Sequence, residues 1–287
     1  MTQLEINLPY FDLILRGFAD GDRDLEQAFG RHVHWGYWAD PSHAHNTVED
    51  FCQAAEQLTH EIYTAALVQD GQSLLDAGCG FGGTVASLNE NFQNMTLTGL
   101  NIDERQLEQA QQKVIAQGNN HIHWVEGNAC QLPFPDASFD RVLAVECIFH
   151  FPDRGQFFRE AFRVLKPGGY LALSDFVPQG WFVPLIALQA QLQNSLQNSG
   201  FYGRSDVTYA LEDYQRLAAE VGFQTHIERD ITENTLPTYD FLLKFGARNG
   251  YDWSQLPAFA ETLTIALVSR LWLVKYMILA YQKPTFQ

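Results

Sequence analysis

One glycine-rich stretch constrains the fold of this chain more than any other feature of its sequence. It follows the apolar pair Leu74 and Leu75, precedes a helix-like segment, and places glycine at positions 78, 80, 82 and 83. Glycine adopts positive φ angles without strain and lets a ligand approach the backbone closely. The pattern therefore predicts a tight turn from a strand into a helix, at the sheet edge where open α/β folds bind their ligands.

The rest of the chain alternates short apolar runs with helix-like segments. Strands are expected at residues 73–79, 96–102, 121–126, 141–147, 170–176, 223–231 and 275–282. Helical patterns such as residues 104–117 and 156–164 separate them. This spacing predicts one α/β domain over residues 1–287, with a doubly wound, seven-stranded and mostly parallel sheet that helices cover on both faces.

Two aromatic-rich segments fall outside this alternation. Residues 1–41 include Tyr10 and Trp35, and residues 177–210 include Trp181. Both are placed to close over the ligand-binding edge of the sheet, the first as an N-terminal lid and the second as a cap over the substrate. Ordinary helical packing on the flank of the sheet is the alternative for both segments.

The net charge and the cysteines of the chain indicate which binding partners and which cellular compartment to expect. The 287 residues include 18 Lys and Arg against 34 Asp and Glu, a formal net charge of −16. An acidic surface repels phosphates, so nucleic acid and membranes are not expected partners. The four cysteines lack paired spacing, and the chain shows neither a signal peptide nor an apolar run long enough to span a bilayer. We expect a soluble, cytoplasmic protein with reduced thiols, and the sequence leaves its oligomeric state open.

The residues around the glycine turn indicate which kind of ligand it binds. The spacing of Gly78, Gly80, Gly82 and Gly83 differs from the G-x-G-x-x-G pattern of dinucleotide-binding folds. Asp76 lies just before the first glycine, where a carboxylate would repel a pyrophosphate but can hold a cationic amino group. The expected ligand is a nucleoside with an amino-acid tail, and a nicotinamide-dependent dehydrogenase is disfavoured.

Five segments together resemble the motifs of class I S-adenosylmethionine-dependent methyltransferases. They follow one another in the order typical of that family, at residues 74–83, 99–102, 127–134, 139–141 and 166–169. The resemblance implies S-adenosylmethionine as the cofactor and a single methyltransferase domain over the whole chain. It implies the same doubly wound fold that the strand spacing predicts.

The resemblance also implies which residues contact the cofactor. They are Tyr37, Asp76, Gly78, Gly80, Asn101, Ile102, Gln106, Asn128, Ala129, Cys130 and Glu146. Asn101 stands where most relatives carry an acid that binds the ribose hydroxyls, with Asp103 as the second candidate. Asn128 replaces an acid in the adenine-contact segment, and an amide can make the same hydrogen bonds. For Gln106, one turn into the next helix, a solvated helix face is the alternative.

Two further segments resemble the branch of the family that methylates small molecules, including sugar and other natural-product O-methyltransferases. Residues 34–38 match its N-terminal His-x-Gly-Tyr-Trp element, which implies that Tyr37 reaches the cofactor. Residues 146–154 match its Glu-x-x-x-His-Met-Pro-Asp-Arg element, with Phe151 in place of Met. Glu146 is expected to anchor the cofactor or its loop rather than to act as an acid.

His150 and Asp175 are the expected catalytic residues. His150 lies just beyond the fourth expected strand and Asp175 lies at the end of the fifth. The resemblance implies that these two positions act together, and a carboxylate beside an imidazole orients it and stabilises its protonated form, as a general base requires. The alternative for His150 is that it only orders the loop around the acceptor.

The predicted reaction is methyl transfer to a hydroxyl of a small-molecule acceptor, either a natural product or a sugar-like compound. N-methylation of a small amine is one alternative. C-methylation of a prenyl or indole acceptor is another, because aromatic faces stabilise carbocations.

Three His-x-His pairs are potential half-sites for a metal ion, at residues 32 and 34, 43 and 45, and 121 and 123. The last pair lies in an expected strand well before its binding edge, and the middle pair follows a Pro-Ser turn. No metal site is therefore expected.

Overall fold

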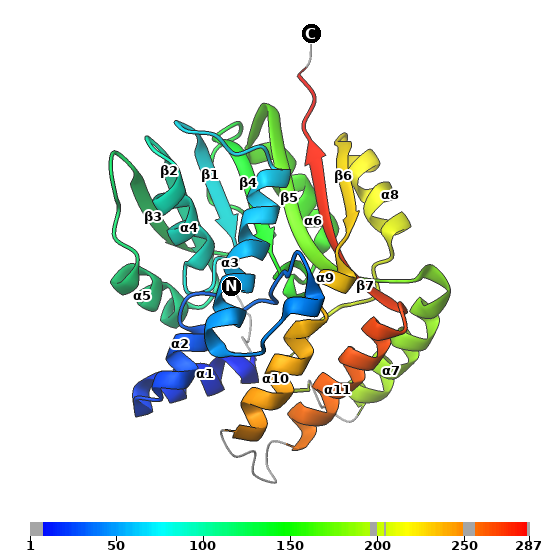
Figure 1. Cartoon of the computed structure of the whole chain (residues 1–287). Coiled ribbons are helices and arrows are strands. Elements are labelled where there is room, and N and C mark those ends of the chain that lie inside the picture. The colour runs from blue at the N-terminus through cyan, green and yellow to red at the C-terminus, as the bar shows by residue number, and fades with distance from the viewer. Residues whose placement is uncertain (1–7, 196–199, 204, 249–255, 286–287) are drawn as a thin grey trace.

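The computed structural model describes residues 8–195, 200–203, 205–248 and 256–285 (Figure 1). Its centre is a seven-stranded sheet in the order β3-β2-β1-β4-β5-β7-β6. The strands are β1 (Ser73–Ala77), β2 (Thr96–Asn101), β3 (His121–Glu126), β4 (Phe139–Val145), β5 (Leu165–Pro178), β6 (Gln224–Asp230) and β7 (Val274–Gln282). Neighbouring strands pair in parallel except at β7, which is antiparallel to both β5 and β6. The predicted doubly wound, mostly parallel sheet is confirmed.

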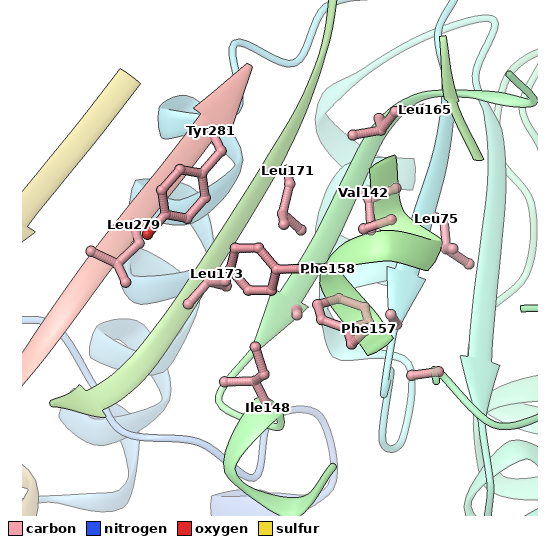
Figure 2. Close-up of a cluster of buried hydrophobic side chains, with 14 of the residues drawn as sticks. Leu75, Val142, Ile148, Phe157, Phe158, Leu165, Leu171, Leu173, Leu279 and Tyr281 are labelled. Carbon is pink, nitrogen blue, oxygen red and sulfur yellow. The ribbon is translucent and has the colours of Figure 1, made fainter. Parts of the chain in front are cut away.

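Helices cover both faces of this sheet. They are α3 (Val48–Ala65), α4 (Gly83–Asn91), α5 (Glu104–Lys113), α6 (Arg154–Val164) and α8 (Leu211–Val221). Because successive strand residues point to opposite faces, β1 sends Leu75 into the cluster around Phe157 and Phe158 of α6 that Figure 2 shows. Its neighbour Leu74 packs on the other face, in a cluster with Leu58 of α3. Both faces of the sheet are therefore buried.

Further helices gather at the carboxyl ends of the parallel strands, at the bottom of Figure 1. They are α1 (Pro9–Asp20), α2 (Arg23–Phe29), α7 (Val183–Ser195), α10 (Pro237–Arg248) and α11 (Leu256–Arg270), with the short elements η1 (Pro41–His43), η2 (Ile148–His150), η3 (Gly180–Phe182) and α9 (Thr232–Thr235). The expected lid (residues 1–41) and cap (residues 177–210) both contribute to this end, although residues 1–7, 196–199 and 204 lie outside the described residues. The segment between β6 and β7 adds a third group of helices that sequence patterns did not place there.

β1 and β4 each end two residues earlier than expected, and both differences shape the site. β1 ends at Ala77 because Gly78 begins the turn with a φ of 85°. β4 ends at Val145 because Glu146 adopts a left-handed φ of 48°. The chain therefore turns away from the sheet at two adjacent strand ends, which leaves room between them for a ligand.

The turn before α4 needs glycine at position 82 either for its left-handed backbone or for its close packing, and the substitution Gly82→Ala tests which. Gly82 has a φ of 80°, and a Cβ there would lie 2.6 Å from the ring of Trp124. Gly82→Ala is expected to lower the free energy of unfolding by about 2–4 kcal/mol, because it adds overpacking to the left-handed backbone cost.

Gly71→Ala is the matched control, because Gly71 has a φ of 78° but no described atom within 4 Å of an added Cβ. It should cost about 1–2 kcal/mol, the backbone cost alone. Urea denaturation measures both variants, and equal losses would contradict a packing role for Gly82.

Candidate functional site

A cavity lies at the ends of β1, β2 and β4, beside the turn that precedes α4. All the expected cofactor residues except Tyr37 and Cys130 line it, namely Asp76, Gly78, Gly80, Asn101, Ile102, Gln106, Asn128, Ala129 and Glu146. The candidate base His150 belongs to the same lining, together with Tyr10 of α1. Residues from distant parts of the sequence thus meet in one site.

The glycine turn forms one wall of this cavity. Gly78 and Gly80 have φ angles of 85° and 54°. A Cβ on Gly78 would lie 2.8 Å from the Sγ atom of Cys147, which follows β4. The backbone N–H groups of Gly78 and Cys79 both donate to the carbonyl oxygen of Leu100, at 2.8 and 3.0 Å. Glycine at position 78 is therefore required both by its backbone angle and by the close approach of the neighbouring strand end.

Asp76 is a buried charge without a partner. It is 1% exposed, and neither carboxylate oxygen has a hydrogen-bond partner among the described residues. Burial raises the pKa of Asp76 to about 7. Burying a carboxylate is costly unless a cation or a donor completes the site. The positively charged amino group of S-adenosylmethionine fits this requirement.

Asn101 and Gln106 form a second polar group in the lining. Nδ2 of Asn101 donates to Oε1 of Gln106 at 2.9 Å, and its Oδ1 accepts the backbone N–H of Ile102 at 2.7 Å. Gln106 is 2% exposed, so the solvated helix face considered for it is wrong. Asp103 caps α5, forms an ion pair with Arg105 and lies outside the lining. The two amides, rather than Asp103, face the cavity.

Tyr37 and Cys130 lie outside the cavity lining. The backbone N–H of Tyr37 donates to the carbonyl of Ala54 in α3 at 2.8 Å, and its ring packs against the core on that face. The Sγ atom of Cys130 donates to the carbonyl of Asp153 at 3.2 Å. The parts of the N-terminal segment that line the cavity are Leu8, Tyr10, Phe11 and residues 31–34. Cofactor contact by Tyr37 or Cys130 has no support in this geometry.

Glu146 fastens the N-terminal segment to the sheet. Its Oε2 accepts the backbone N–H of Trp35 at 2.9 Å and also accepts the hydroxyl of Tyr276 in β7. Its own backbone N–H donates to Oγ of Ser174 at 3.0 Å. Burial raises the pKa of Glu146 to about 8. These contacts fit the anchoring role expected for Glu146 at the edge of the cavity.

His150 ends the short helix η2 and lines the cavity. Its Nε2 lies 3.3 Å from the hydroxyl of Tyr10, and the two rings are stacked with centroids 6.1 Å apart. Tyr10 is a site residue that the sequence motifs do not contain. A single tyrosine in a helical segment carries no spacing signal, so only the aromatic content of residues 1–41 pointed to this region.

The expected pairing of Asp175 with His150 is not formed within the described residues. Asp175 is fully buried outside the cavity lining. It accepts a hydrogen bond from the hydroxyl of Tyr214 in α8 and lies 3.2 Å from Nη2 of Arg154 in α6. The physical reason is the alternation of side chains along β5, which turns Asp175 toward the face that α6 and α8 cover.

Arg154 connects Asp175 to the turn that carries His150. It is 1% exposed, its Nη2 donates to the carbonyl of Asp206, and its Nε lies 3.5 Å from the carbonyl oxygen of Ile148. The backbone N–H of Asp206 donates in turn to the carbonyl of Phe149 at 2.8 Å. Asp175 thus supports η2 through Arg154, as a positioning residue.

Within the described part of the chain, no group of three or more His, Cys, Asp or Glu side chains is placed to hold a metal ion. No helix of that part is both long and apolar enough to cross a membrane. Among the His-x-His pairs, His32 and His34 form a buried contact of 3.1 Å, whereas His43 is exposed beside Asp40.

Known proteins resemble this chain in sequence. Residues 75–173 match a family described as a methyltransferase domain. Methyltransferase GfsG of Streptomyces halstedii is 33% identical over 217 residues, which cover 75% of this chain and 73% of that protein. The 27-O-demethylrifamycin SV methyltransferase of Amycolatopsis mediterranei is 34% identical over 217 residues, which cover 75% of each chain.

The fold also has close structural neighbours. The mycolic acid cyclopropane synthase CmaA1, complexed with SAH and CTAB, superposes with a TM-score of 0.76 and covers 96% of this chain and 99% of its own. At 17% identity this likeness shows the fold alone. The family match and the methyltransferase relatives together indicate S-adenosylmethionine as the cofactor.

Cofactor affinity should depend on the charge of Asp76, whose pKa is about 7 in the free protein. The carboxylate must lose its proton to hold a cation, so affinity for S-adenosylmethionine should fall about tenfold per pH unit below that value. Asp76→Asn should remove this dependence and weaken binding at alkaline pH by about 10–100-fold, the equivalent of one charge-assisted hydrogen bond. Titration calorimetry across neutral pH measures both effects.

Thermal denaturation separates this binding role from a folding defect. Because the pKa of Asp76 is raised, ionising it costs stability, and that cost appears as pH rises from about 4 in the unfolded chain toward about 7. Asp76→Asn should therefore leave the Tm of the free protein unchanged or higher above neutral pH. A lower Tm combined with unchanged affinity would contradict the assignment.

Arg154→Met is expected to lower the free energy of unfolding by about 3–5 kcal/mol, because it removes the cation that faces the buried Asp175. Arg159→Met is the matched control on the same helix. The Arg159 side chain is 56% exposed and lies 3.9 Å from Asp153, so its loss should change stability by about 0.5 kcal/mol or less. Urea denaturation compares the two variants, and similar losses would show that Asp175 does not depend on Arg154.

Proposed function

The chain belongs to the class I S-adenosylmethionine-dependent methyltransferases, and we propose that it transfers the methyl group to a hydroxyl of a small-molecule acceptor. The observation that carries this proposal is the place of His150 in the cavity that the expected cofactor residues line. An imidazole there can accept the proton that a hydroxyl loses as it takes up the methyl group. The name of the Amycolatopsis relative, which specifies an oxygen position, supports an oxygen acceptor.

S-adenosylmethionine supplies a methyl group already activated by its bond to a positively charged sulfur atom. The chain then has to bind and orient the cofactor. In our proposal Asp76 holds the amino group, and Asn101 with Gln106 binds the ribose hydroxyls. Asn128 and Ala129 belong to the same lining and would contact the adenine.

His150 receives the proton of the acceptor at Nε2, and Tyr10 competes for that nitrogen. A neutral imidazole has one bare nitrogen, and the hydroxyl of Tyr10 lies 3.3 Å from Nε2. Burial and the nearby charge of Glu146 raise the pKa of Tyr10 well above its usual value, so its hydroxyl stays protonated. The acceptor hydroxyl must therefore replace or share the Tyr10 contact, which links α1 to acceptor binding.

Aromatic side chains extend from His150 toward the cap and indicate the character of the acceptor. The Phe149 ring lies 4.4 Å from that of His150 and 5.7 Å from that of Phe176, between ring centroids. The Trp35 ring lies 5.3 Å from Phe176 and 6.0 Å from Tyr202. These rings form a buried aromatic cluster beside His150, and such surroundings suit an acceptor with an apolar or aromatic body. They favour a natural product over a free sugar.

Methyl incorporation from labelled S-adenosylmethionine tests the proposed acceptor class. The full chain is offered phenolic and macrocyclic hydroxyls, small amines, and prenyl or indole carbons, and NMR locates the new methyl group in each product. We expect methylation on oxygen. Transfer only to nitrogen or only to carbon would overturn the proposal.

His150→Ala should lower the rate of methyl transfer to an accepted hydroxyl by about 10²–10⁴-fold, the usual contribution of a general base. Affinity for S-adenosylhomocysteine should not change, because the ring acts on the acceptor. His45→Ala, at an exposed histidine, is the matched control and should leave the rate unchanged. Full turnover by His150→Ala would show that the ring only orders the loop.

A further inference from the structure

Residues 31–34, called the strap below, lie between the cofactor cavity and helices α3 and α4. All four residues line the cavity. The strap also touches the first residue of α4, since a Cβ on Gly83 would lie 2.3 Å from the carbonyl oxygen of Arg31 and 2.5 Å from Nδ1 of His32. The position of the strap therefore decides whether this side of the cavity is closed.

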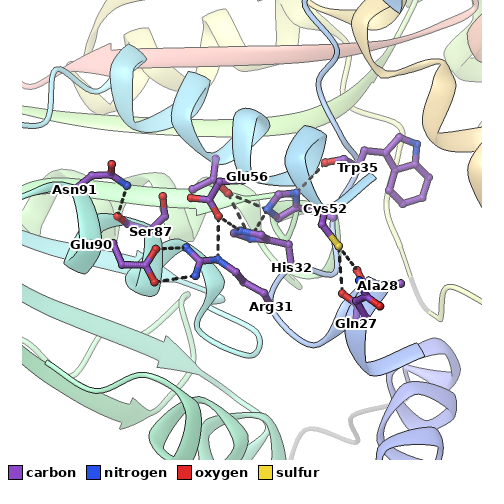
Figure 3. Close-up of polar contacts among 12 residues, drawn as sticks. Gln27, Ala28, Arg31, His32, Trp35, Cys52, Glu56, Ser87, Glu90 and Asn91 are labelled. Carbon is purple, nitrogen blue, oxygen red and sulfur yellow. Dashed lines mark hydrogen bonds and ion pairs between the residues drawn. The ribbon is translucent and has the colours of Figure 1, made fainter. Parts of the chain in front are cut away.

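Two carboxylates hold the outer side of the strap, as Figure 3 shows. Arg31 donates to Glu56 of α3 at 2.8 Å and to both oxygens of Glu90 of α4 at 2.8 Å. Nε2 of His32 lies 2.8 Å from the same Oε2 of Glu56. Burial would raise the pKa of Glu56, but the hydrogen bonds and charges of His32 and Arg31 lower it to about 2. Glu56 is therefore an ionised acceptor at neutral pH.

On the inner side of the strap, the imidazole rings of His32 and His34 contact each other. Both rings are buried, with His32 5% and His34 8% exposed. Nδ1 of His34 lies 2.9 Å from the carbonyl oxygen of Trp35, and its Nε2 lies 3.1 Å from Nδ1 of His32. The hydroxyl of Thr59 in α3 lies 3.0 Å from Nε2 of His34 and 3.5 Å from Nδ1 of His32.

The outer contacts determine which nitrogen of each ring carries hydrogen. A carbonyl oxygen only accepts, so Nδ1 of His34 is protonated toward Trp35. The carboxylate of Glu56 only accepts, so Nε2 of His32 is protonated toward it. With both rings neutral, the 3.1 Å contact would bring two bare nitrogens together. Flipping either ring would lose its outer hydrogen bond, and the single hydrogen of Thr59 can serve only one of the two nitrogens.

We propose that His32 and His34 are positioning residues for cofactor binding, and that they hold the strap in place by sharing one proton beyond those of two neutral rings. The proton makes Nδ1 of His32 a donor to Nε2 of His34, which turns a repulsive contact into a charge-assisted hydrogen bond. The proposal depends on the cofactor site alone and is independent of which acceptor the enzyme uses.

The surrounding charges favour His32 as the ring that carries the proton. The charged groups that face the pair are Arg31 of the strap, Glu56 of α3 and Glu90 of α4, and neutral Tyr63 of α3 lies near Glu56. If His32 is an imidazolium, the two positive charges of Arg31 and His32 balance the two negative charges of Glu56 and Glu90, and this group of four side chains is neutral overall. Without the proton, the group carries a net negative charge in a half-buried position.

Burial opposes the charge on both rings, and it lowers the pKa of His34 to about 3. Burial acts in the same direction on His32, whereas the hydrogen bond and the charge of Glu56 act to raise its pKa. In the proposal, the effects that favour the charged ring outweigh burial at His32. The contact with the bare nitrogen of His34 further stabilises the charged form of His32. When pH rises enough to remove this proton, the strap should loosen and cofactor affinity should fall. This alkaline loss is distinct from the acid loss assigned to Asp76.

Long-range ¹H–¹⁵N NMR spectra of the full chain with labelled histidine test the proton count directly. At neutral pH we expect His32 to be protonated on both nitrogens and His34 to be neutral with hydrogen on Nδ1. The variants His32→Gln and His34→Gln assign the signals, and either one suffices. If both rings are neutral in the wild-type protein at neutral pH, the proposal is wrong, whatever the variants show.

The variant Glu56→Gln tests whether the extra proton on the histidine pair contributes to cofactor binding. Glu90→Gln is the matched control, because Glu90 is the other carboxylate that accepts from Arg31. The doubly protonated signal should disappear at neutral pH in Glu56→Gln only. Affinity for S-adenosylhomocysteine should then fall at least tenfold in Glu56→Gln, and its alkaline loss should begin at lower pH than in the wild type. Because the amino group of the ligand titrates identically in every variant, an unchanged affinity profile in Glu56→Gln would contradict the positioning role.

Discussion

A carboxylate buried without a partner at the end of β1 is the constraint on which the rest of the site depends. Folding alone gains nothing from burying Asp76, because a charge removed from water needs a compensating cation or hydrogen bonds. The glycine turn and the end of β4 shield it from water and leave it facing the cavity. The free protein thus gives up some stability at a functional site, as enzymes commonly do. In our proposal, the amino group of the cofactor supplies the missing charge.

The N-terminal segment closes this cavity through contacts of three kinds, which tie cofactor binding to the chemistry. Glu146 fixes the backbone of Trp35, the strap lies against the start of α4, and Tyr10 reaches Nε2 of His150. In the proposed arrangement, the first two contacts lie at the cofactor side and the third at the acceptor side. A movement of α1 would therefore change access to the base as well as the enclosure of the cofactor.

Local patterns in the sequence were enough to predict the sheet and one wall of the site. Alternation of apolar runs and helices depends on neighbouring residues, and it placed all seven strands. The turn at Gly78 and the charge of Asp76 could be interpreted because their chemistry is local to a few residues. The amide at Asn101 was also identified, and its hydrogen bond to the buried Gln106 excludes a solvated helix face for that glutamine.

The contacts that were missed depend on distances across the fold. Asp175 was expected beside His150 because two strand ends are neighbours, yet the direction of one side chain along β5 sends it to Arg154 instead. Tyr10 enters the site because α1 packs on Phe81 of the glycine turn and brings the tyrosine to His150 of η2. No spacing in the sequence encodes that contact. The helices between β6 and β7 reach the lid end for the same kind of reason.

A crystal structure of the chain with S-adenosylhomocysteine bound would test the central claim most directly. The quantity to measure is the distance from the amino nitrogen of the ligand to the nearer carboxylate oxygen of Asp76. We predict about 2.8 Å, the length of a charge-assisted hydrogen bond, with the sulfur atom on the side of the cavity that His150 lines. An amino group bound elsewhere, with Asp76 still unpaired, would contradict the account of the site given above.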